Sequence, residues 1–207
     1  MEILGNDIKN SWGMTCARVV VGIAKPITNS IRIPGASTDL DITEINGFVT
    51  YENRELSIEL HKMNYRNASE VSRNDIVNKI NGRYGKIKVN DEYYFNGRVR
   101  IDAIEEAGAL SIYKIKVSAE PYKYKTTETS YTFNVEDSKV VELYNECMPV
   151  IPTIITDADF ILEYEGITLM IDAGESRLPD ILLKAGINQI KCTGTGSITF
   201  TYREGAL

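Results

Sequence analysis

The chain has 207 residues and a formal net charge of −6. Hydrophobic residues make up 43% of it and charged residues 25%, and both values are ordinary for a globular protein that forms its own core. The acidic balance argues against a sequence-independent nucleic-acid binder, because such a protein needs a basic face. The N-terminal residues lack a signal-peptide core, and the longest apolar run, residues 19–24, is too short to cross a bilayer.

Alternation of apolar and polar residues dominates the first part of the chain. Strands are predicted at residues 18–24 and 27–33, on either side of Pro26. Further alternation around Val49 and Tyr51, and again at residues 56–60, predicts a hairpin closed at residues 52–54. This pattern is typical of antiparallel strands with one buried face.

One segment, residues 69–84, has a helical pattern instead. Val77, Ile80 and Tyr84 recur at spacings of three and four, and Gly82 supplies a stop signal. Ser72 followed by Asp75 resembles a capping box. The sequence therefore predicts a single helix, whose apolar stripe we interpret as a face of the core.

Strands resume after this helix, at residues 86–89, 92–104 and 110–119. The pair Asn96-Gly97 is usually a hairpin signal, but the strand pattern continues through it, which favours a bulge at Gly97 within one long strand. Pro121 and a polar run then interrupt the pattern. We therefore expect a domain boundary near residue 125, with domains at residues 1–125 and 126–207.

The second domain is predicted to contain only short strands. They are expected at residues 130–135, 139–145, 153–156, 160–166, 167–172, 181–184, 187–192 and 197–203. Turn residues separate them throughout, and many short strands with this punctuation indicate a β-sandwich. The expected fold class is therefore mainly β.

Residues that carry catalysis or bind metals are sparse. A catalytic dyad or triad would have to use His61, the single histidine, which we interpret as a surface residue at a strand end. Cys16, Cys147 and Cys192 have no metal-ligand spacing and are expected to be reduced thiols.

Acidic clusters and one glycine-rich turn complete the candidates for chemistry. The clusters Asp39/Asp41/Glu44, Glu105/Glu106 and Asp157/Asp159 match no calcium-loop pattern and are interpreted as solvated turns. The glycine-rich residues 194–196 precede a predicted strand rather than a helix, so they indicate a hairpin turn and not a phosphate site. The sequence therefore predicts no catalytic, cofactor-binding or metal-binding residues and no cofactor.

Several segments, taken in order, resemble the distal tail proteins (Dit-like proteins) of long non-contractile-tailed bacteriophages and prophages. They are IPGASTDLDITEINGFVTYENRELSIEL at residues 33–60, the predicted helix ending in Ile80-Asn81-Gly82, YFNGRV at residues 94–99, AEPYK at residues 119–123, and the closing residues 177–203. The sequence differs from the family pattern at residues 36–38, which are Ala-Ser-Thr in place of a Gly-rich loop with a basic residue.

The resemblance implies a tail-tube-like β-sandwich or barrel with one α-helix at residues 1–125, and a galectin-like β-sandwich at residues 126–207. It implies a structural hub of the tail tip or baseplate rather than an enzyme. In this role six copies form a ring that joins the tail tube to the tail-tip fibre or lysin protein. The implied partners are these proteins and the tape-measure protein, with viral DNA passing through the ring and no membrane contact. The implied location is the virion tail tip, after assembly in the host cytoplasm.

The physical chemistry of a ring adds two expectations. Long alternating strands at residues 47–60 and 92–119 are candidates for the ring contact, because strand edges can extend a sheet between neighbours. Six chains at −6 each would carry about −36, which is the sign that keeps DNA phosphates from adhering to a lumen.

Two other functions compete with the hub. A carbohydrate-binding module on the second domain, acting in host cell-surface recognition, is one alternative. It would lack a tryptophan platform, because the only tryptophan, Trp12, is in the first domain. A tail-tip hydrolase is the other, and the scarcity of histidine and of nucleophile motifs argues against it.

Overall fold

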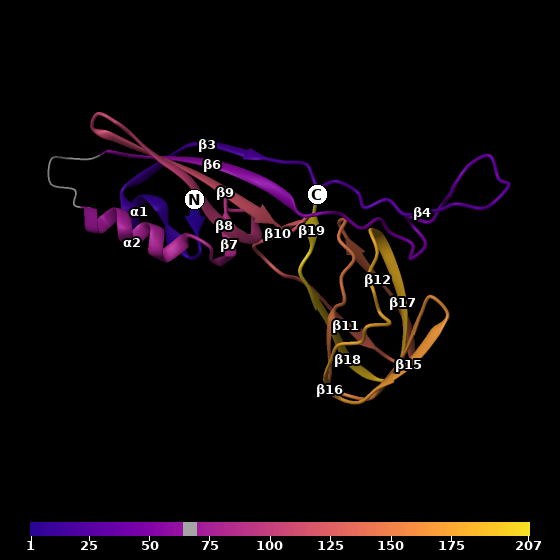
Figure 1. Cartoon of the computed structure of the whole chain (residues 1–207). Helices are drawn as coiled ribbons and strands as arrows, with labels where there is room; N and C mark the ends of the chain where they lie inside the picture. The colour runs from indigo at the N-terminus through magenta and orange to yellow at the C-terminus, as the bar shows by residue number, and fades with distance from the viewer. Residues whose placement is uncertain (64–69) are drawn as a thin grey trace. The chain divides into compact units, whose positions relative to one another are not determined.

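The computed structural model describes residues 1–63 and 70–207, and gives no side-chain placement for residues 70–72. The chain divides into two compact units, Met1–Lys123 and Tyr124–Leu207 (Figure 1). Each unit has its own cluster of buried apolar side chains. The described residues form nineteen strands and two helices, which confirms the expected mainly β fold class.

The first unit is built on one antiparallel sheet. Its strands lie in the order β2 (Asn6–Asp7), β1 (Glu2–Ile3), β7 (Tyr84–Lys88), β8 (Tyr93–Ala107), β9 (Leu110–Ala119), β6 (Arg54–Met63) and β3 (Met14–Val21). Three of these, β6, β8 and β9, are long central strands. Leu56, Val117 and Val99 face one another across them in register, and all three are fully buried.

Two helices contribute to the core of this unit, α1 (Ile8–Trp12) and α2 (Glu70–Ile80). Ile8 and Trp12 of α1, and Ile76 and Ile80 of α2, are buried together with the inward-facing residues of the sheet. The period of two along the strands thus places one face of the sheet in the core and leaves the other in solvent.

The sequence analysis predicted one helix and missed α1. This short helix begins after Asp7, whose carboxylate accepts hydrogen bonds from the backbone N–H groups of Lys9 and Asn10 at 3.1 and 2.7 Å. It ends at Gly13, which has a left-handed conformation with φ of 63°. The N-cap and C-cap residues were readable in the sequence, but five residues are too few to show a helical period.

Helix α2 confirms the predicted helix in its C-terminal half. Ile80 is its last residue, and Gly82, at φ of 76°, turns the chain into β7. Tyr84 belongs to that strand and not to the helix. The helix already includes Ser72, so the expected capping box does not mark its start; residue 69 and the Ser72 side chain lie outside the described residues.

Strand β8 runs unbroken through Asn96-Gly97, as predicted, but the bulge is elsewhere. The register shifts between Ile101 and Ala103, whereas Gly97 pairs regularly with Gly85 and Ala119. A Cβ on Gly97 would lie 2.7 Å from Val117 Cγ1 and 2.8 Å from Ala119 Cα. Glycine is therefore needed here because neighbouring strands approach closely.

Residues 22–53 contradict the prediction of long strands at residues 27–33 and around Val49. Regular pairing in this segment is limited to β4 (Ser30–Ile31) with β5 (Leu40–Asp41), and to one bridge between Pro26 and Tyr51. Strand β6 begins at Arg54, so residues 52–54 do not close a hairpin. The alternation of apolar and polar residues predicted strands here because the same pattern occurs in a strand of a sheet and in an extended segment that pairs with no sheet.

The second unit is a β-sandwich of two four-stranded sheets. One has the order β11 (Thr129–Val135), β18 (Gly196–Tyr202), β13 (Thr153–Thr156) and β16 (Gly174–Ser176). The other has the order β12 (Ser138–Asn145), β17 (Gly186–Thr193), β14 (Phe160–Tyr164) and β15 (Ile167–Ile171). The inner faces of both sheets supply one buried cluster, which includes Leu143, Leu162, Ile190 and Phe200.

Short elements complete this unit. Strand β10 (Lys123–Lys125) spans the unit boundary, and β19 (Gly205–Ala206) ends the chain. The predicted strand at residues 181–184 is absent; only an isolated bridge joins Leu183 to Val150. A strand follows the glycine-rich residues, as predicted, but the hairpin is wrong: β17 and β18 belong to different sheets, so the turn carries the chain from one layer of the sandwich to the other.

Candidate assembly surfaces

Residues 22–53, between β3 and β6, form what we call the arm. Its two legs bond to each other: the backbone N–H of Ile27 donates to Thr50 O at 2.9 Å, and that of Ile42 donates to Asn29 O at 2.9 Å. Arg32 and Asp39 form an ion pair near the tip at 2.8 Å. None of the residues in the buried cluster of the unit belongs to the arm. Packing is limited to its base, where Ala24 is buried and the ring of Tyr51 lies 5.9 Å from that of Tyr122, so most of the arm depends on backbone hydrogen bonds.

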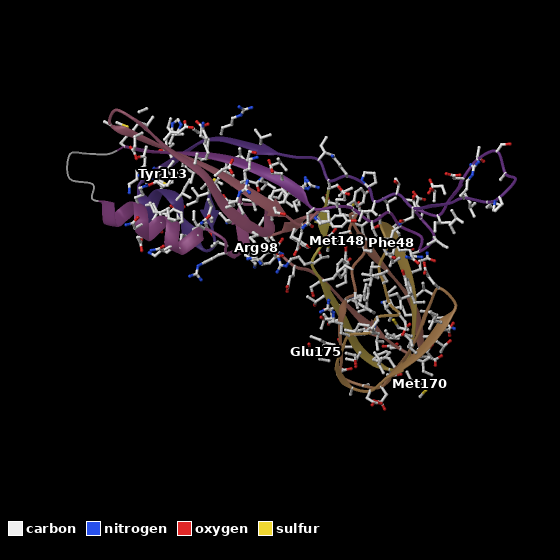
Figure 2. All side chains as sticks on the ribbon, in the orientation of Figure 1. Phe48, Arg98, Tyr113, Met148, Met170 and Glu175 are labelled. Carbon is white, nitrogen blue, oxygen red and sulfur yellow. The ribbon has the colours of Figure 1, made fainter. Side chains whose placement is uncertain are left out.

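The arm exposes large aliphatic side chains to solvent. Ile23 is 90% exposed and Ile45 is 73% exposed. Four further aliphatic side chains of the arm are exposed: Ile27, Ile31, Ile33 and Leu40. Figure 2 shows the side chains of this hairpin standing out from a thin ribbon, with Phe48 labelled on its second leg. Single exposed aliphatic residues are common on protein surfaces, but six on one segment are not. A concentration of this kind indicates a protein–protein contact.

The sheet of the first unit has different free edges from those expected. Strand β6 is bonded to β3 and β9, and β9 is bonded to β6 and β8, so these strands have no free side. Residues 54–60 and 110–119 therefore offer no free strand edge, whereas the rest of the ring contact expected along residues 47–60 and 92–119 stays a prediction. Along the main path of the described sheet the outermost strands are β2 and β3, of which only β3 is long, and a short branch of β10 and β19 leaves this path at β8.

The solvent face of this sheet carries charges of both signs. Lys116 Nζ lies 3.4 Å from Glu55 Oε1, and Arg100 Nη2 lies 2.8 Å from Asp102 Oδ1. Exposed ion pairs of this kind contribute little to folding stability. The face is therefore a wet, charged surface that another protein can contact, rather than the inner face of a second sandwich layer.

The second unit exposes apolar residues on the outer face of the sheet that contains β12. Met170, labelled in Figure 2, is 83% exposed and pairs with Ile161 across β14 and β15. Tyr144 pairs with Ile187 across β12 and β17. A pocket of about 360 Å³ beside Met170 is also lined by Asp137, Asp159, Asp172 and Thr195. Trp12 is only 6% exposed, within the core of the first unit, so it cannot serve as a sugar-stacking platform.

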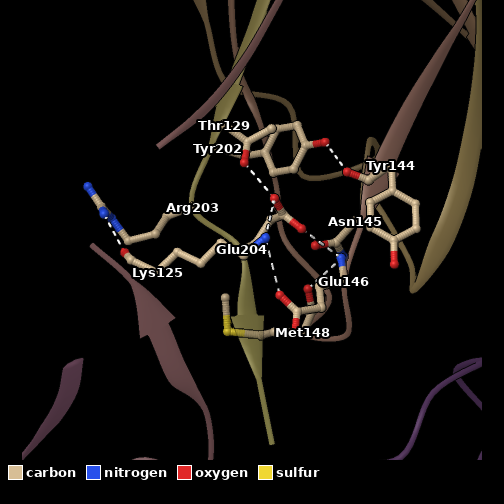
Figure 3. Close-up of polar contacts among 9 residues, drawn as sticks. All are labelled: Lys125, Thr129, Tyr144, Asn145, Glu146, Met148, Tyr202, Arg203 and Glu204. Atoms are coloured by element: carbon tan, nitrogen blue, oxygen red, sulfur yellow. Dashed lines mark hydrogen bonds and ion pairs between the residues drawn. The ribbon is translucent and has the colours of Figure 1, made fainter. Parts of the chain in front are cut away.

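A polar cluster, which we call the terminal clamp, fixes the two ends of the second unit (Figure 3). It consists of Lys125, Thr129, Glu146, Arg203 and Glu204. Glu204 is only 4% exposed, and its carboxylate accepts from Lys125 Nζ at 3.1 Å, from the Glu146 N–H at 3.0 Å and from the Thr129 hydroxyl. Arg203 Nη1 donates to the carbonyl oxygens of Lys125 and Thr126 at 2.6 and 2.8 Å. Residues 125–129 are thereby tied to the C-terminal residues.

Charge and burial oppose each other inside this clamp. Burial raises the pKa of the Glu204 carboxyl, but hydrogen bonds from Thr129 and Lys125 and the charge of Lys125 outweigh it, so the pKa lies below its usual value. Burial lowers the pKa of the Lys125 ammonium, but hydrogen bonds to Glu204 and Glu146 have a larger combined effect, so the pKa lies above its usual value. Both groups are therefore held in their charged forms.

The residues with catalytic or metal-binding chemistry are dispersed. His61 lies in β6, with Nε2 2.7 Å from Glu59 Oε1 on the exposed face. Cys16, Cys147 and Cys192 are free thiols, and burial raises the pKa of Cys192 to about 11. Within residues 1–63 and 70–207, no three Cys, His, Asp or Glu side chains group closely enough to hold a metal ion. The helices of this described part are all too short or too polar to span a membrane.

Only one of the three acidic clusters, Asp157/Asp159, lies wholly in a turn or loop as predicted, because Asp41 belongs to β5 and the other pair belongs to β8. Asp157 and Asp159 accept hydrogen bonds from the backbone N–H groups of Ser197 and Ala173 at 2.7 and 3.0 Å, which stabilises turns of the second unit. Glu105 and Glu106 belong to β8 instead of a turn. Asp39, Asp41 and Glu44 lie exposed on the arm. The features that sequence reasoning missed are the arm and Arg54, whose roles depend on contacts that alternation does not encode.

Comparison with known proteins gives one informative result. No protein-family model matches the chain, and no curated protein matches its sequence. The crystal structure of the Dit protein (gp19.1) of phage SPP1, described as a paradigm of the hub adsorption apparatus of phages that infect Gram-positive bacteria, matches with a TM-score of 0.63. Sequence identity is 15%, and the match covers 99% of this chain and 97% of the SPP1 chain. The protein therefore has, over nearly its whole length, the fold of a phage distal tail protein.

Proposed function

We propose that this protein is a structural subunit of a phage tail tip, in which six copies form a ring that joins the tail tube to a tail-tip fibre or lysin protein. The arm is the observation that carries this proposal. A segment of 32 residues that has only one buried side chain, Ala24, yet exposes six large aliphatic side chains, needs another protein to cover it. The whole-length fold match with the SPP1 protein supports a hub as that assembly.

A closed ring needs the same two different surfaces on every subunit. Such a heterologous contact closes when the rotation between neighbours is fixed. The arm supplies one surface, and its legs are already ordered by internal hydrogen bonds, so little conformational entropy is lost on docking. Burying each exposed isoleucine or leucine would contribute about 1.5–3 kcal/mol before the costs of association.

The rest of the assembly follows the same proposal. We assign the first unit to ring formation as a tail-tube-like domain, and the second as a galectin-like β-sandwich. Partners would be the tail-tube protein, the fibre or lysin protein and the tape-measure protein, with viral DNA passing through the ring in the virion. The acidic lumen stays a prediction, which a structure of the ring would test.

The test is the mass of the assembly in solution. Native mass spectrometry of the intact chain should give six copies, and negative-stain images should show six-fold rings. A variant in which a short Gly-Ser loop replaces residues 29–48 should stay monomeric while its first unit unfolds as in the parent chain. If the isolated chain is monomeric, the measurement is repeated with tail-tube protein added. A stable dimer or tetramer would contradict the proposal.

A further inference from the structure

The dipeptide Asn-Gly occurs three times in the chain, at residues 46–47, 81–82 and 96–97. In this dipeptide the backbone nitrogen of the glycine can attack the side-chain amide of the asparagine, because glycine has no Cβ to hinder the approach. The attack requires the backbone to leave its folded conformation and the asparagine side chain to rotate freely. Since all three pairs have the same two residues, their structural surroundings decide which of them reacts.

Asn96-Gly97 is held inside the sheet of the first unit. It belongs to β8, where the carbonyl oxygen of Asn96 accepts from the backbone N–H of Glu120 at 2.8 Å and Gly97 is buried between neighbouring strands. The Asn96 side chain also contacts Glu120, with Nδ2 3.4 Å from Oε2. Attack here requires the central sheet to open, and opening a core strand costs a large part of the free energy of global unfolding.

Asn81-Gly82 is exposed, but hydrogen bonds to β8 fix both of its residues. Asn81 Oδ1 accepts from the backbone N–H of Ile101 at 2.9 Å. The N–H of Gly82 donates to the carbonyl oxygen of Val99 at 2.8 Å, and the carbonyl oxygen of Gly82 accepts from Arg98 Nη1 at 2.7 Å. Neither the attacking nitrogen nor the amide can therefore move without losing contacts with the sheet.

Asn46-Gly47 lies on the arm and is much less restrained. Both residues are exposed in a turn, and the Asn46 side chain has no hydrogen-bond partner among the residues that the structure describes. The N–H of Gly47 donates to the carbonyl oxygen of Glu44 at 2.8 Å. This bond closes one exposed turn with no core behind it, and such turns open at little cost in free energy.

We propose that Asn46 is a site of spontaneous deamidation, which adds a carboxylate to the arm. The Gly47 backbone nitrogen loses its proton to solvent and bonds to Asn46 Cγ; the Cγ–Nδ2 bond breaks, and the side-chain nitrogen takes up a proton and leaves as ammonia. Water then hydrolyses the cyclic imide. Cleavage at Cγ gives aspartate, and cleavage at the backbone carbonyl carbon gives isoaspartate. Water is the only co-reactant, and no group is oxidised or reduced.

The new carboxylate lies beside the apolar residues of the arm. Ile45, the preceding residue, is 73% exposed. Residues 22–53 contain four carboxylates and two cations, so deamidation changes the formal charge of the arm from −2 to −3. The effect on assembly rests on the proposed function: if the arm docks on another copy through its aliphatic side chains, deamidated chains should be depleted from rings, because burying an unpaired charge is costly.

Peptide mapping by mass spectrometry tests the site on the full chain, kept in mildly alkaline buffer at a dilution where native mass spectrometry shows single chains. Conversion at Asn46 should be at least about tenfold faster than at Asn81 or Asn96, a difference that needs only about 1.4 kcal/mol in the free energy of local opening. In urea the three rates should become similar, which controls for sequence. Asn46→Ser, which removes the amide, should abolish conversion at this position. Equal rates in the folded chain, or no conversion at Asn46, would overturn the proposal.

Assembly separates the site from its effect. In a partly deamidated sample, the modified chains should be enriched among single chains and depleted from rings. Asn46→Asp should weaken ring formation, whereas Asn46→Ser should not. Rings that contain modified chains in proportion would place this turn outside the ring contact and leave the site standing. Rings from an aged sample that is unmodified at Asn46 would overturn the site but not the function, and absence of rings under any condition would reject the function while the mapping still decides the site.

Discussion

Glu204 shows how a single buried charge organises the second unit. Its carboxylate is nearly inaccessible, yet three donors, one of them the Lys125 ammonium, satisfy it. Removing one partner of a buried ion pair leaves the other charge uncompensated, which costs more than the pair contributes. The clamp is therefore a place where small substitutions have large effects.

Replacing Glu204 should destabilise the second unit. We expect Glu204→Ala to lower the free energy of unfolding by about 2–4 kcal/mol, and Glu204→Gln, which keeps the shape but not the charge, by about 1–2 kcal/mol. Urea denaturation of the full chain measures both. The control is Glu128→Gln: Glu128 pairs with Arg203 at 2.9 Å but is exposed, so a change within about 0–1 kcal/mol is expected. Equal losses for both positions would show that burial is unimportant here.

The clamp also sets a pH window. The pKa of Glu204 is lowered below its ordinary value of 4.5, so its contribution is present above pH 4.5 and is lost as the pH falls through the folded-state pKa. The pKa of Lys125 is raised above 10.5, so its contribution is present below pH 10.5 and is lost as the pH rises further. Unfolding of wild type and Glu204→Gln at several pH values should converge below pH 4.5. A difference between them that stays constant in acid would contradict this.

Gly97 is constrained by steric contact, whereas Glu204 is constrained by charge. Because a Cβ there would meet backbone atoms of β9, Gly97→Ala should lower the free energy of unfolding by about 1–3 kcal/mol. Gly85, directly opposite in β7, is the matched control, since its Cβ would meet only the flexible end of Leu4. Gly85→Ala should cost less than Gly97→Ala in the same denaturation experiment. The reverse order would rule out close approach as the reason for Gly97.

At the scale of elements, sequence reading succeeded where an element has one buried face. Strands β6, β8 and β9 and the end of α2 were predicted because alternate or helically spaced residues enter a core, as Leu56, Ile58 and Leu60 do. It failed on the arm, where Ile27, Ile31 and Ile33 share one side of the predicted strand but remain 39–49% exposed. Alternation of apolar and polar residues indicates that one face of a strand is buried, but it does not indicate whether the same chain or another protein covers that face.

The arm and the core should respond differently to the loss of an isoleucine. Ile45→Asp should change the free energy of unfolding by less than about 0.5 kcal/mol, because the side chain is exposed, but should weaken ring formation. Ile58→Ala, in the core, should cost about 2–5 kcal/mol. Thermal or urea unfolding, read beside native mass spectrometry, separates the two effects. Strong destabilisation by Ile45→Asp would mean that the arm packs on its own unit.

For the whole molecule, two separate cores lead us to expect two separately folding bodies. Fragments of residues 1–123 and 124–207 should each unfold cooperatively, and their transitions should both be visible in calorimetry of the intact chain. A fragment of residues 126–207 lacks Lys125 and should be less stable than residues 124–207, because it loses the ammonium that pairs with Glu204. Equal stability of the two fragments would show that Lys125 is dispensable.

The boundary illustrates what the sequence could and could not provide. Pro121 and the polar residues that follow it indicate a break, but the role of Lys125 depends on Glu204, 79 residues later. The contact of Arg54 with Phe95 has the same character. These residues are 41 positions apart and meet only because β6, β9 and β8 are neighbours in the sheet. Such pairings come from topology, which local patterns do not specify.

The terminal clamp has a consequence for how such proteins diversify. In a sandwich whose first and last strands are fastened together, both chain ends lie at one place, so recombination there can replace the entire unit without rethreading any strand. Proteins that share the first unit could then carry unrelated second units, provided that each brings its own fastening residues with it.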